Sequence, residues 1–246
     1  GVCHQLQLEN FAKPGKTLVG SDSHTPTCGA MGMIAIGAGG LDVAVAMATG
    51  TYYLQCPSVV RVNLVGKKAK WASAKDVILY ILQQLSVKGG VNKIIEYTGE
   101  GLKELSLTDR ATICNMGAEL GATTSVFPTD EITKEYLIQQ GREEDYVELK
   151  ADVDATYDEE ITVDLSKLVP LTAKPHSPDA VVPVSELRGM KINQVVIGSC
   201  TNSSLPDMLK AAKILKGRRV ATHVSLVIAP GSSSILAMLS KCGALA

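Results

Sequence analysis

The sequence has few aromatic residues and no excess of basic charge. Phenylalanine, tryptophan and tyrosine make up 4% of its 246 residues, whereas there are 22 glycines. This excludes an aromatic-rich β-sandwich core and favours a turn-rich α/β chain with close backbone approaches. The formal net charge is −1, from 24 Lys and Arg against 25 Asp and Glu. Nucleic acid is therefore not expected as the main partner, because that binding depends on clustered positive charge.

Cysteine is present, but it is spaced too widely for the usual cysteine motifs. No Cys-x-x-Cys occurs, which excludes a zinc ribbon and a thioredoxin-like redox motif. We expect no disulfide framework in so long a chain without a signal peptide, and we therefore expect a reducing compartment. That compartment is the cytoplasm or, in a eukaryote, the mitochondrial matrix. The six cysteines are Cys3, Cys28, Cys56, Cys114, Cys200 and Cys242.

The sequence also lacks a long uninterrupted hydrophobic run and an initiator methionine. Its most apolar window, Gly29 to Gly50, contains six glycines and Asp42, so we expect no membrane span there. The chain opens on Gly1 and stops at Ala246, directly after a predicted helix. We expect it to be part of a longer protein.

Segments typical of strands alternate with segments typical of helices. Residues 59–65 place Val60, Val62 and Leu64 on one face, as in a half-buried strand. Ser73 and Asp76 form a capping-box start for a helix. The alternation predicts an α/β fold of three-layer units, with mainly parallel sheets covered by helices. The other predicted strands are 16–20, 93–97, 123–127, 194–197 and 224–228. The other predicted helices are 41–48, 108–120, 131–140, 205–215 and one that ends at Lys241.

Four segments carry more detailed expectations. The helix 41–48 is rich in small residues, and we expect it to pack tightly in the interior. Thr108 is the expected N-cap of the helix that follows it. Between residues 143 and 160, nine acidic residues against one basic residue indicate a solvated surface. Four prolines within residues 170–183 mark the best linker candidate.

Residues 21–25, Ser-Asp-Ser-His-Thr, follow a predicted strand and precede a glycine-rich stretch. Asp22, Ser23 and His24 at the end of a strand can bind an oxygen-rich ligand and move a proton. The same residues can instead form an Asx-type turn in which His24 has no chemical role. His4 is a second candidate. If the fold brings it near Asp22, the carboxylate would fix the tautomer of its ring, although a lone histidine is more often structural.

Two further constellations could carry chemistry. Asn115 and Glu119 lie four residues apart, which places an amide and a carboxylate on one face of a predicted helix. They form either a site or a structural buried hydrogen bond. Cys200 lies between a strand and a helix N-terminus, where the helix dipole favours a thiolate that acts as nucleophile or metal ligand. The alternative is an inert buried cysteine.

Six segments together resemble the aconitase superfamily of iron–sulfur hydro-lyases, in the family's order and over the length of the chain. The run Gly-Ala-Thr-Thr-Ser-Val-Phe-Pro at 121–128 resembles aconitate hydratase more than 3-isopropylmalate dehydratase. The resemblance implies interconversion of citrate and isocitrate through cis-aconitate, with a [4Fe–4S] cluster whose open iron acts as a Lewis acid. The segments are residues 1–5, 18–26, 35–42, 87–90, 111–128 and 196–204.

The resemblance also assigns roles to particular residues. It makes Cys200 the first of three cysteine ligands of the cluster. Ser23 matches a substrate-contacting serine and Asn115 an active-site, substrate-binding asparagine near the cluster. The catalytic residues that it implies are two histidine–carboxylate pairs, His4 with Asp22 and His24 with Glu119.

Parts of the family's pattern are missing from this sequence. The other two cluster cysteines of the family lie in a Cys-x-x-Cys that is absent here, and Cys242 is not in such a motif. An earlier Asp-His pair, later substrate-binding arginines and the catalytic serine of the mobile last domain are also absent. Residues 1–57 then correspond to the end of the first domain, 58–170 to the second, and 171–246 to a linker and the start of the third.

From these departures we expect that the chain alone neither holds an intact cluster nor turns over. Its expected partners are a small tricarboxylate and the missing domains of its own protein. The first alternative is a related hydro-lyase, a 3-isopropylmalate or homoaconitate dehydratase large subunit. Another is an RNA-binding, iron-responsive regulator, against which the lack of a basic stripe argues. A third is a cluster-free interaction module.

Overall fold

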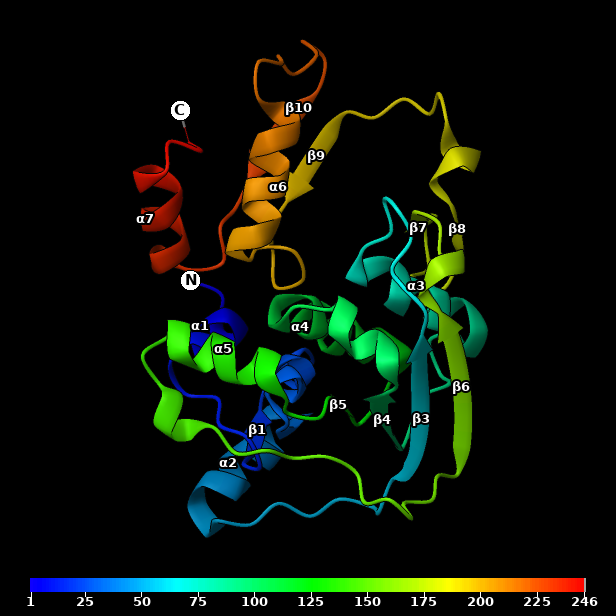
Figure 1. The fold of residues 1–246 in the computed structure, drawn as a ribbon, viewed down its shortest axis with the longest axis vertical. Coiled ribbons are helices and arrows are strands. Elements are labelled where there is room, and N and C mark those ends of the chain that lie inside the picture. Colours follow the sequence, from blue (N-terminus) through cyan, green and yellow to red (C-terminus); the bar gives the residue numbers. More distant parts are fainter. Residues whose placement is uncertain (246) are drawn as a thin grey trace. The chain divides into compact units, whose positions relative to one another are not determined.

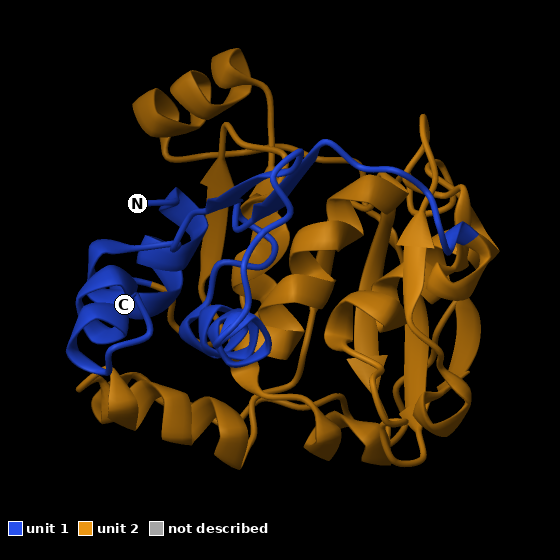
Figure 2. Cartoon of the chain, turned by 90° about the horizontal axis from the view of Figure 1, so that it is seen from above, with its two compact units in different colours: residues 1–11, 187–246 blue, residues 12–186 orange. Residues whose placement is uncertain are grey.

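The computed structural model describes residues 1–245, which form two compact units (Figure 2). Unit 1 comprises residues 1–11 and the chain from residue 187 onward, and unit 2 comprises residues 12–186. Unit 1 thus joins the two ends of the sequence. The domain boundaries at residues 57 and 170 stay predictions beside this division.

The main sheet of unit 2 has four parallel strands in the order β5-β4-β3-β6 (Figure 1). The strands are β3 (Ser58–Val65), β4 (Lys93–Thr98), β5 (Thr124–Val126) and β6 (Glu159–Asp164). Parallel neighbours need crossover connections, which here contain the helices of the unit. The predicted α/β class with mainly parallel sheets is confirmed.

The hydrophobic core of unit 2 lies between this sheet and its helices. Val60, Val62 and Leu64 of β3 are fully buried, which confirms the predicted alternation. Helix α3 (Ala74–Leu85) begins at the predicted capping box of Ser73 and Asp76. The helix buries one apolar face, as its periodicity predicts.

The N-cap of helix α4 (Leu107–Met116) lies two residues earlier than predicted. The N-cap is Ser106, whose side chain accepts a hydrogen bond from the backbone N–H of Asp109 and completes a capping box with it. Thr108 was therefore the wrong choice, because Asp109 lies at the spacing that a capping box requires from Ser106. After Met116 the chain tightens into the 3₁₀ helix η3 (Gly117–Leu120). The predicted single helix is thus two segments.

A smaller parallel pair in unit 2, β1 (Thr17–Gly20) and β2 (Ile34–Gly37), is joined by the 3₁₀ helix η1 (Thr25–Met31). Helix α2 (Gly40–Thr49) follows β2 and has no buried residue. The expectation of a tightly packed interior helix was therefore wrong for the described chain. Small residues permit close packing, but they do not supply a neighbour to pack against.

The last part of unit 2 is ordered where the prolines indicated a linker. Strands β7 (Leu171–Ala173) and β8 (Val181–Pro183) form an antiparallel hairpin. The Asp76 carboxylate accepts a 2.6 Å hydrogen bond from the backbone N–H of Leu171, which ties the hairpin to α3. Helix α5 (Glu131–Gln139) agrees with its prediction.

Unit 1 contains helix α1 (Cys3–Asn10) and a second α/β unit. The parallel strands β9 (Gln194–Ile197) and β10 (Ser225–Ile228) are accompanied by helices α6 (Leu205–Leu215) and α7 (Ser233–Lys241). All four elements lie close to their predicted positions. A small core formed by Met208, Ile235 and Leu239 holds the two helices together.

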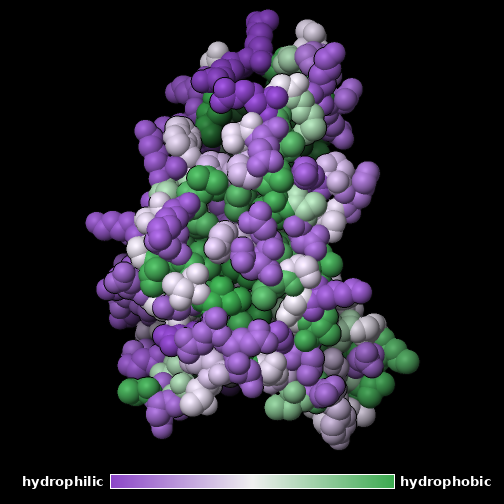
Figure 3. Space-filling view, turned by 90° about the vertical axis from the view of Figure 1, so that its right-hand side faces the viewer, coloured by the Kyte–Doolittle hydropathy of each residue, from purple (hydrophilic) through white to green (hydrophobic). Residues whose placement is uncertain are grey.

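Two observations concern the hydrophobic residues of the chain. No helix among the described residues is both long and apolar enough to cross a bilayer. The face nearest to β6 carries hydrophobic side chains between hydrophilic ones (Figure 3).

Candidate active site

The candidate site is built on the turn that follows β1. The Asp22 carboxylate accepts a 2.7 Å hydrogen bond from the backbone N–H of His24, which is the Asx-type turn that was one reading of this motif. Gly37 of β2 lies directly against the turn, since a Cβ there would come within 2.7 Å of the Asp22 carbonyl oxygen. The glycine therefore permits the turn to fold back onto the strand.

The imidazole of His24 lies between a hydroxyl and a carboxylate. Its Nδ1 is 3.0 Å from Ser23 Oγ, and its Nε2 is 3.3 Å from Glu119 Oε1. Asp22 Oδ1 is 3.7 Å from the same Nδ1. When neutral His24 donates from Nε2 to Glu119, its Nδ1 accepts from the Ser23 hydroxyl. The Asx turn and the His24–Glu119 contact thus coexist, and the catalytic role of the pair stays a prediction.

Asn115 lies beneath this turn and does not face solvent. Its side chain is fully buried, and its Nδ2 donates a 2.8 Å hydrogen bond to Thr27 Oγ1. Glu119 lies four residues further along the same segment of chain, in η3. Asn115 belongs to α4 and Glu119 to η3, so the helix changes type between them; their side chains reach Thr27 and His24, respectively. Asn115 as a direct substrate contact stays a prediction.

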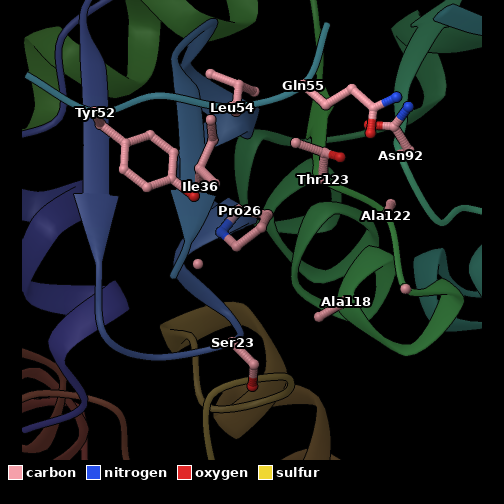
Figure 4. A pocket seen from close by; sticks show the side chains of 12 residues that line it. Ser23, Pro26, Ile36, Tyr52, Leu54, Gln55, Asn92, Ala118, Ala122 and Thr123 are labelled. Carbon is pink, nitrogen blue, oxygen red and sulfur yellow. The ribbon is translucent and has the colours of Figure 1, made fainter. Parts of the chain in front are cut away.

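A pocket of about 430 Å³ opens beside the turn in unit 2 (Figure 4). Ser23 is the predicted site residue that lines it, from the end nearest the turn. The other polar side chains of its wall are uncharged: Tyr52, Gln55, Asn92 and Thr123. These four residues carry no signal in the sequence, because isolated amide and hydroxyl residues form no motif.

His4 and Cys200 belong to unit 1, whereas Asp22, Ser23, His24, Asn115 and Glu119 belong to unit 2. His4 is a buried residue of α1, and its ring nitrogens lie 3.6 and 3.9 Å from the sulfur of Cys3. The implied pair of His4 with Asp22 stays a prediction. Cys200 is half-buried in the turn between β9 and α6, the position that its sequence context indicated.

The cysteines of this chain do not by themselves fit an iron–sulfur cluster. Such clusters are held by several cysteine thiolates gathered around the metal. Unit 1 contains Cys3, Cys200 and Cys242, and its described residues bring no three thiols together. Cys242 instead donates to the Leu239 carbonyl at the end of α7. The described residues of unit 1 therefore do not form a complete cluster site.

Cys28 and Cys114 are buried core residues rather than a reactive thiol site. Burial, with Cys28 close by, raises the pKa of the Cys114 thiol well above its usual value. Its Sγ contacts the Ser125 carbonyl oxygen at 3.7 Å. A protonated thiol is a poor nucleophile, so Cys114 acts as a small hydrophobe, and Cys28 is fully buried as well.

A second pocket, of about 530 Å³, lies in unit 2 between β6, α3 and the β7–β8 hairpin. Its wall includes Tyr80, Gln83 and Lys167, and none of the predicted site residues lines it. The Gln83 amide already donates to the Val181 carbonyl of the hairpin. Of these two pockets, the first is therefore the one that a predicted site residue, Ser23, lines.

Known proteins resemble this chain over its whole length. The model of the aconitase family (aconitate hydratase) matches residues 1–189 and 185–246. The large subunit 2 of 3-isopropylmalate dehydratase from Archaeoglobus fulgidus is 45% identical over 96% of this chain and 56% of its own length. Mitochondrial aconitate hydratase from Schizosaccharomyces pombe is 43% identical over the whole of this chain and 33% of its own length.

A solved structure shares the fold. Aconitase X from Thermococcus kodakaraensis, in its holo form, aligns with a TM-score of 0.51 and 17% identity over 96% of this chain and 54% of that protein. The chain therefore spans between one third and about half of the proteins that it matches. Because the family model covers both units, the chain belongs to the aconitase family.

Proposed function

We propose that this chain is the part of an aconitate-hydratase-type hydro-lyase that carries the His24 proton-transfer group. Hydro-lyases of the family remove and re-add water, which requires a proton for the leaving hydroxyl and a base for a carbon-bound hydrogen. The observation that carries the proposal is the placement of His24 between the Ser23 hydroxyl and the Glu119 carboxylate beside a pocket.

In this proposal, His24 supplies the proton that converts the leaving hydroxyl into water. The Glu119 carboxylate holds the ring orientation and stabilises the imidazolium form by its negative charge. The Ser23 hydroxyl lies beside Nδ1 of His24; it accepts a hydrogen bond from the imidazolium and donates its own proton to a carboxylate of the substrate. Asp22 orients the turn through the His24 backbone N–H and does not itself need to change protonation.

The substrate is the less specific part of the proposal. We favour citrate, isocitrate and cis-aconitate, because the run at residues 121–128 resembles aconitate hydratase. Isopropylmalate is the second candidate, since large subunits of 3-isopropylmalate dehydratase match the chain at similar identity. A homoaconitate dehydratase large subunit is a further alternative within this class. All of these substrates are small organic acids.

Members of the family normally use an iron–sulfur cluster, and we propose a [4Fe–4S] cluster for the complete protein. Bound in the complete protein, the cluster would supply a Lewis acid for the substrate hydroxyl and carboxylate. From the described residues, this chain contributes Cys200 to the ligands, and further thiolates have to come from elsewhere in the complete protein.

The test is a substrate panel on the complete protein that its gene encodes, purified without oxygen. Citrate, isocitrate, cis-aconitate, 3-isopropylmalate and homocitrate are assayed for loss or addition of water. We expect turnover of citrate, isocitrate and cis-aconitate. We expect His24→Gln and Glu119→Gln to lower kcat by about 100-fold. Glu144→Gln, at an exposed acidic residue of unit 2, is the control.

The outcomes separate the two levels of the proposal. Turnover of isopropylmalate alone would replace the substrate and leave the hydro-lyase assignment intact. Wild-type kcat in the His24→Gln protein would remove His24 from the mechanism. No hydration or dehydration of any acid in the panel would overturn the function itself.

A further inference from the structure

The backbone of His24 is fixed on its carbonyl side as firmly as on its amide side. Its carbonyl oxygen accepts two hydrogen bonds from Thr27, one from the backbone N–H at 3.0 Å and one from Oγ1 at 2.6 Å. The hydroxyl bond is the shorter of the two. The side chain of Thr27 thus sets the orientation of the peptide group that follows the imidazole.

The hydroxyl of Thr27 is itself held from the other side. Asn115 Nδ2 donates to it at 2.8 Å, so that Oγ1 accepts one hydrogen bond while it donates another. Both residues are buried, with exposed fractions of 2% for Thr27 and 0% for Asn115. In a buried site this directed chain of hydrogen bonds leaves the hydroxyl little freedom to rotate.

We propose that Thr27 and Asn115 are positioning residues for His24 in the hydro-lyase reaction. This inference rests on the proposed function, in which His24 moves the proton. The buried amide holds the hydroxyl, the hydroxyl holds the His24 carbonyl, and the imidazole is thereby kept within reach of Glu119.

Thr27 bonds to the backbone of His24, and Asn115 bonds to Thr27. The lining of the pocket includes Ser23 but neither Thr27 nor Asn115. In this inference their effect on the reaction is transmitted through His24, because these hydrogen bonds lead from Asn115 through Thr27 to its carbonyl oxygen. Asn115 and Glu119 come from one continuous segment, α4 with η3. This continuity couples the position of Asn115 to the position of the Glu119 carboxylate. Glu119 of that segment contacts the ring of His24. Asn115 of the same segment contacts Thr27, which in turn binds the backbone carbonyl of His24.

The test replaces the hydroxyl without changing the shape of the side chain. In the complete protein, Thr27→Val removes the hydroxyl, whereas Thr27→Ser retains it. We expect Thr27→Val to lower kcat by about 10-fold, with KM nearly unchanged, because a misplaced proton donor slows the reaction more than binding. Thr27→Ser restores most of the wild-type kcat. Combining Thr27→Val with Asn115→Ala adds little, since the two residues act as one unit.

A second background separates positioning from general damage. In the His24→Gln protein, Thr27→Val has no further effect on kcat, because the group that it positions is gone. An equal loss in both backgrounds would show a merely structural role and overturn the inference. An unchanged kcat for Thr27→Val in the otherwise wild-type protein would also overturn it.

An activity-independent readout uses this chain itself. The ring proton and carbon NMR signals of His24, assigned with the His24→Gln variant, are expected to shift in Thr27→Val and to stay in place in Thr27→Ser. Unchanged ring signals in Thr27→Val would overturn the positioning role. If His24→Gln retains full activity while these signals shift, the proposed catalytic function fails but the positioning of the ring by Thr27 stands.

Discussion

His24 is held at both ends of its backbone and at both ring nitrogens. Asp22 binds its N–H, Thr27 binds its carbonyl oxygen, and Ser23 and Glu119 lie beside the two nitrogens. Such contacts fix the rotamer before a substrate arrives, which lowers the entropy lost on reaching a reactive geometry. At the scale of the residue, the site is therefore a preorganised histidine rather than a mobile one.

A second residue, Glu96 in β4, gives a prediction for stability. Burial in the sheet raises the pKa of Glu96 above its usual value of 4.5, while a 3.2 Å hydrogen bond from Tyr157 and the charge of Arg61 act in the opposite direction. With a raised pKa, the folded state binds more protons than the unfolded state just above pH 4.5. The contribution of Glu96 to the free energy of unfolding therefore falls as pH rises through this window and then stays level.

Glu96→Gln keeps an acceptor for Tyr157 and removes the charge. Relative to the wild type, we expect this variant to gain stability as pH rises from 4 to 7, as measured by urea unfolding at each pH. At the acid end the two proteins converge. Glu144→Gln, on the surface, is the control and shows no such trend. A wild type that gains stability over the variant with rising pH would contradict the predicted sign.

At the scale of elements, the candidate turn depends on a close approach between η1 and β5. A Cβ on Gly29 would lie 1.7 Å from the Ser125 carbonyl oxygen, and the Gly29 carbonyl accepts a hydrogen bond from Phe127 N–H. Backbone thus packs on backbone at this point. The contact places η1, and with it Thr27 and His24, against the sheet.

Gly29→Ala is therefore expected to destabilise the chain by about 3 kcal/mol, because a backbone oxygen cannot move aside as a side chain can. Gly40→Ala is the matched control, since no atom lies within 4 Å of the Cβ it would add. There we expect no loss and a gain of up to about 1 kcal/mol from the higher helix propensity of alanine. Thermal and urea unfolding measure both, and equal losses in the two variants would contradict the close-approach argument.

Asp130 connects α5 to α4 through a buried cation. Its carboxylate caps α5 at the N–H groups of Ile132 and Thr133 and binds both terminal nitrogens of Arg110, at 2.9 and 2.5 Å. Arg110 is fully buried. Asp130→Ala leaves this guanidinium without its counter-charge, and we expect a loss of about 3–5 kcal/mol in the free energy of unfolding.

An N-cap residue that is not paired with a buried cation serves as the control for the Asp130 variant. Ser106→Ala removes the cap of α4 without exposing a buried charge, so its expected cost is about 1 kcal/mol. Urea unfolding at pH 7 is the measurement for both variants. Similar losses in the two variants would show that capping alone, and not the pair with Arg110, accounts for the effect.

At the scale of the whole molecule, the chain spans a fraction of its relatives. It covers 56% of the archaeal dehydratase subunit and 33% of the fungal aconitate hydratase. Helix α2 has no buried residue, with Leu41 and Met47 largely exposed. The activity proposed above therefore belongs to the complete protein.

We predict that this chain alone does not assemble a stoichiometric [4Fe–4S] cluster. Anaerobic reconstitution with iron and sulfide, followed by gel filtration and iron analysis, is expected to leave far less than four irons per chain, because its described thiols do not gather. Cys200→Ser changes little in this measurement. A stable four-iron cluster on the isolated chain, with hydratase activity, would contradict both the prediction and the donor argument.

Much of the architecture was predictable because it depends on local periodicity. The strand residues 59–65 and the capping box of Ser73 and Asp76 lie where short-range patterns indicated. The environment of α2 was not predictable, since burial depends on which neighbours are present. The start of α4 was missed because two residues, Ser106 and Thr108, can both cap a helix, and the position of Asp109 decided between them.

The sequence by itself determined the family, the alternation of strands and helices, and the identities of the chemical groups near residues 22–24. These follow from order and spacing along the chain. Only the tertiary structure decided that the imidazole of His24 faces Glu119 and that Asn115 is buried against Thr27. Such contacts join residues about 90 positions apart, and they form only because the packing of η1 and α4 against the sheet fixes both segments at once.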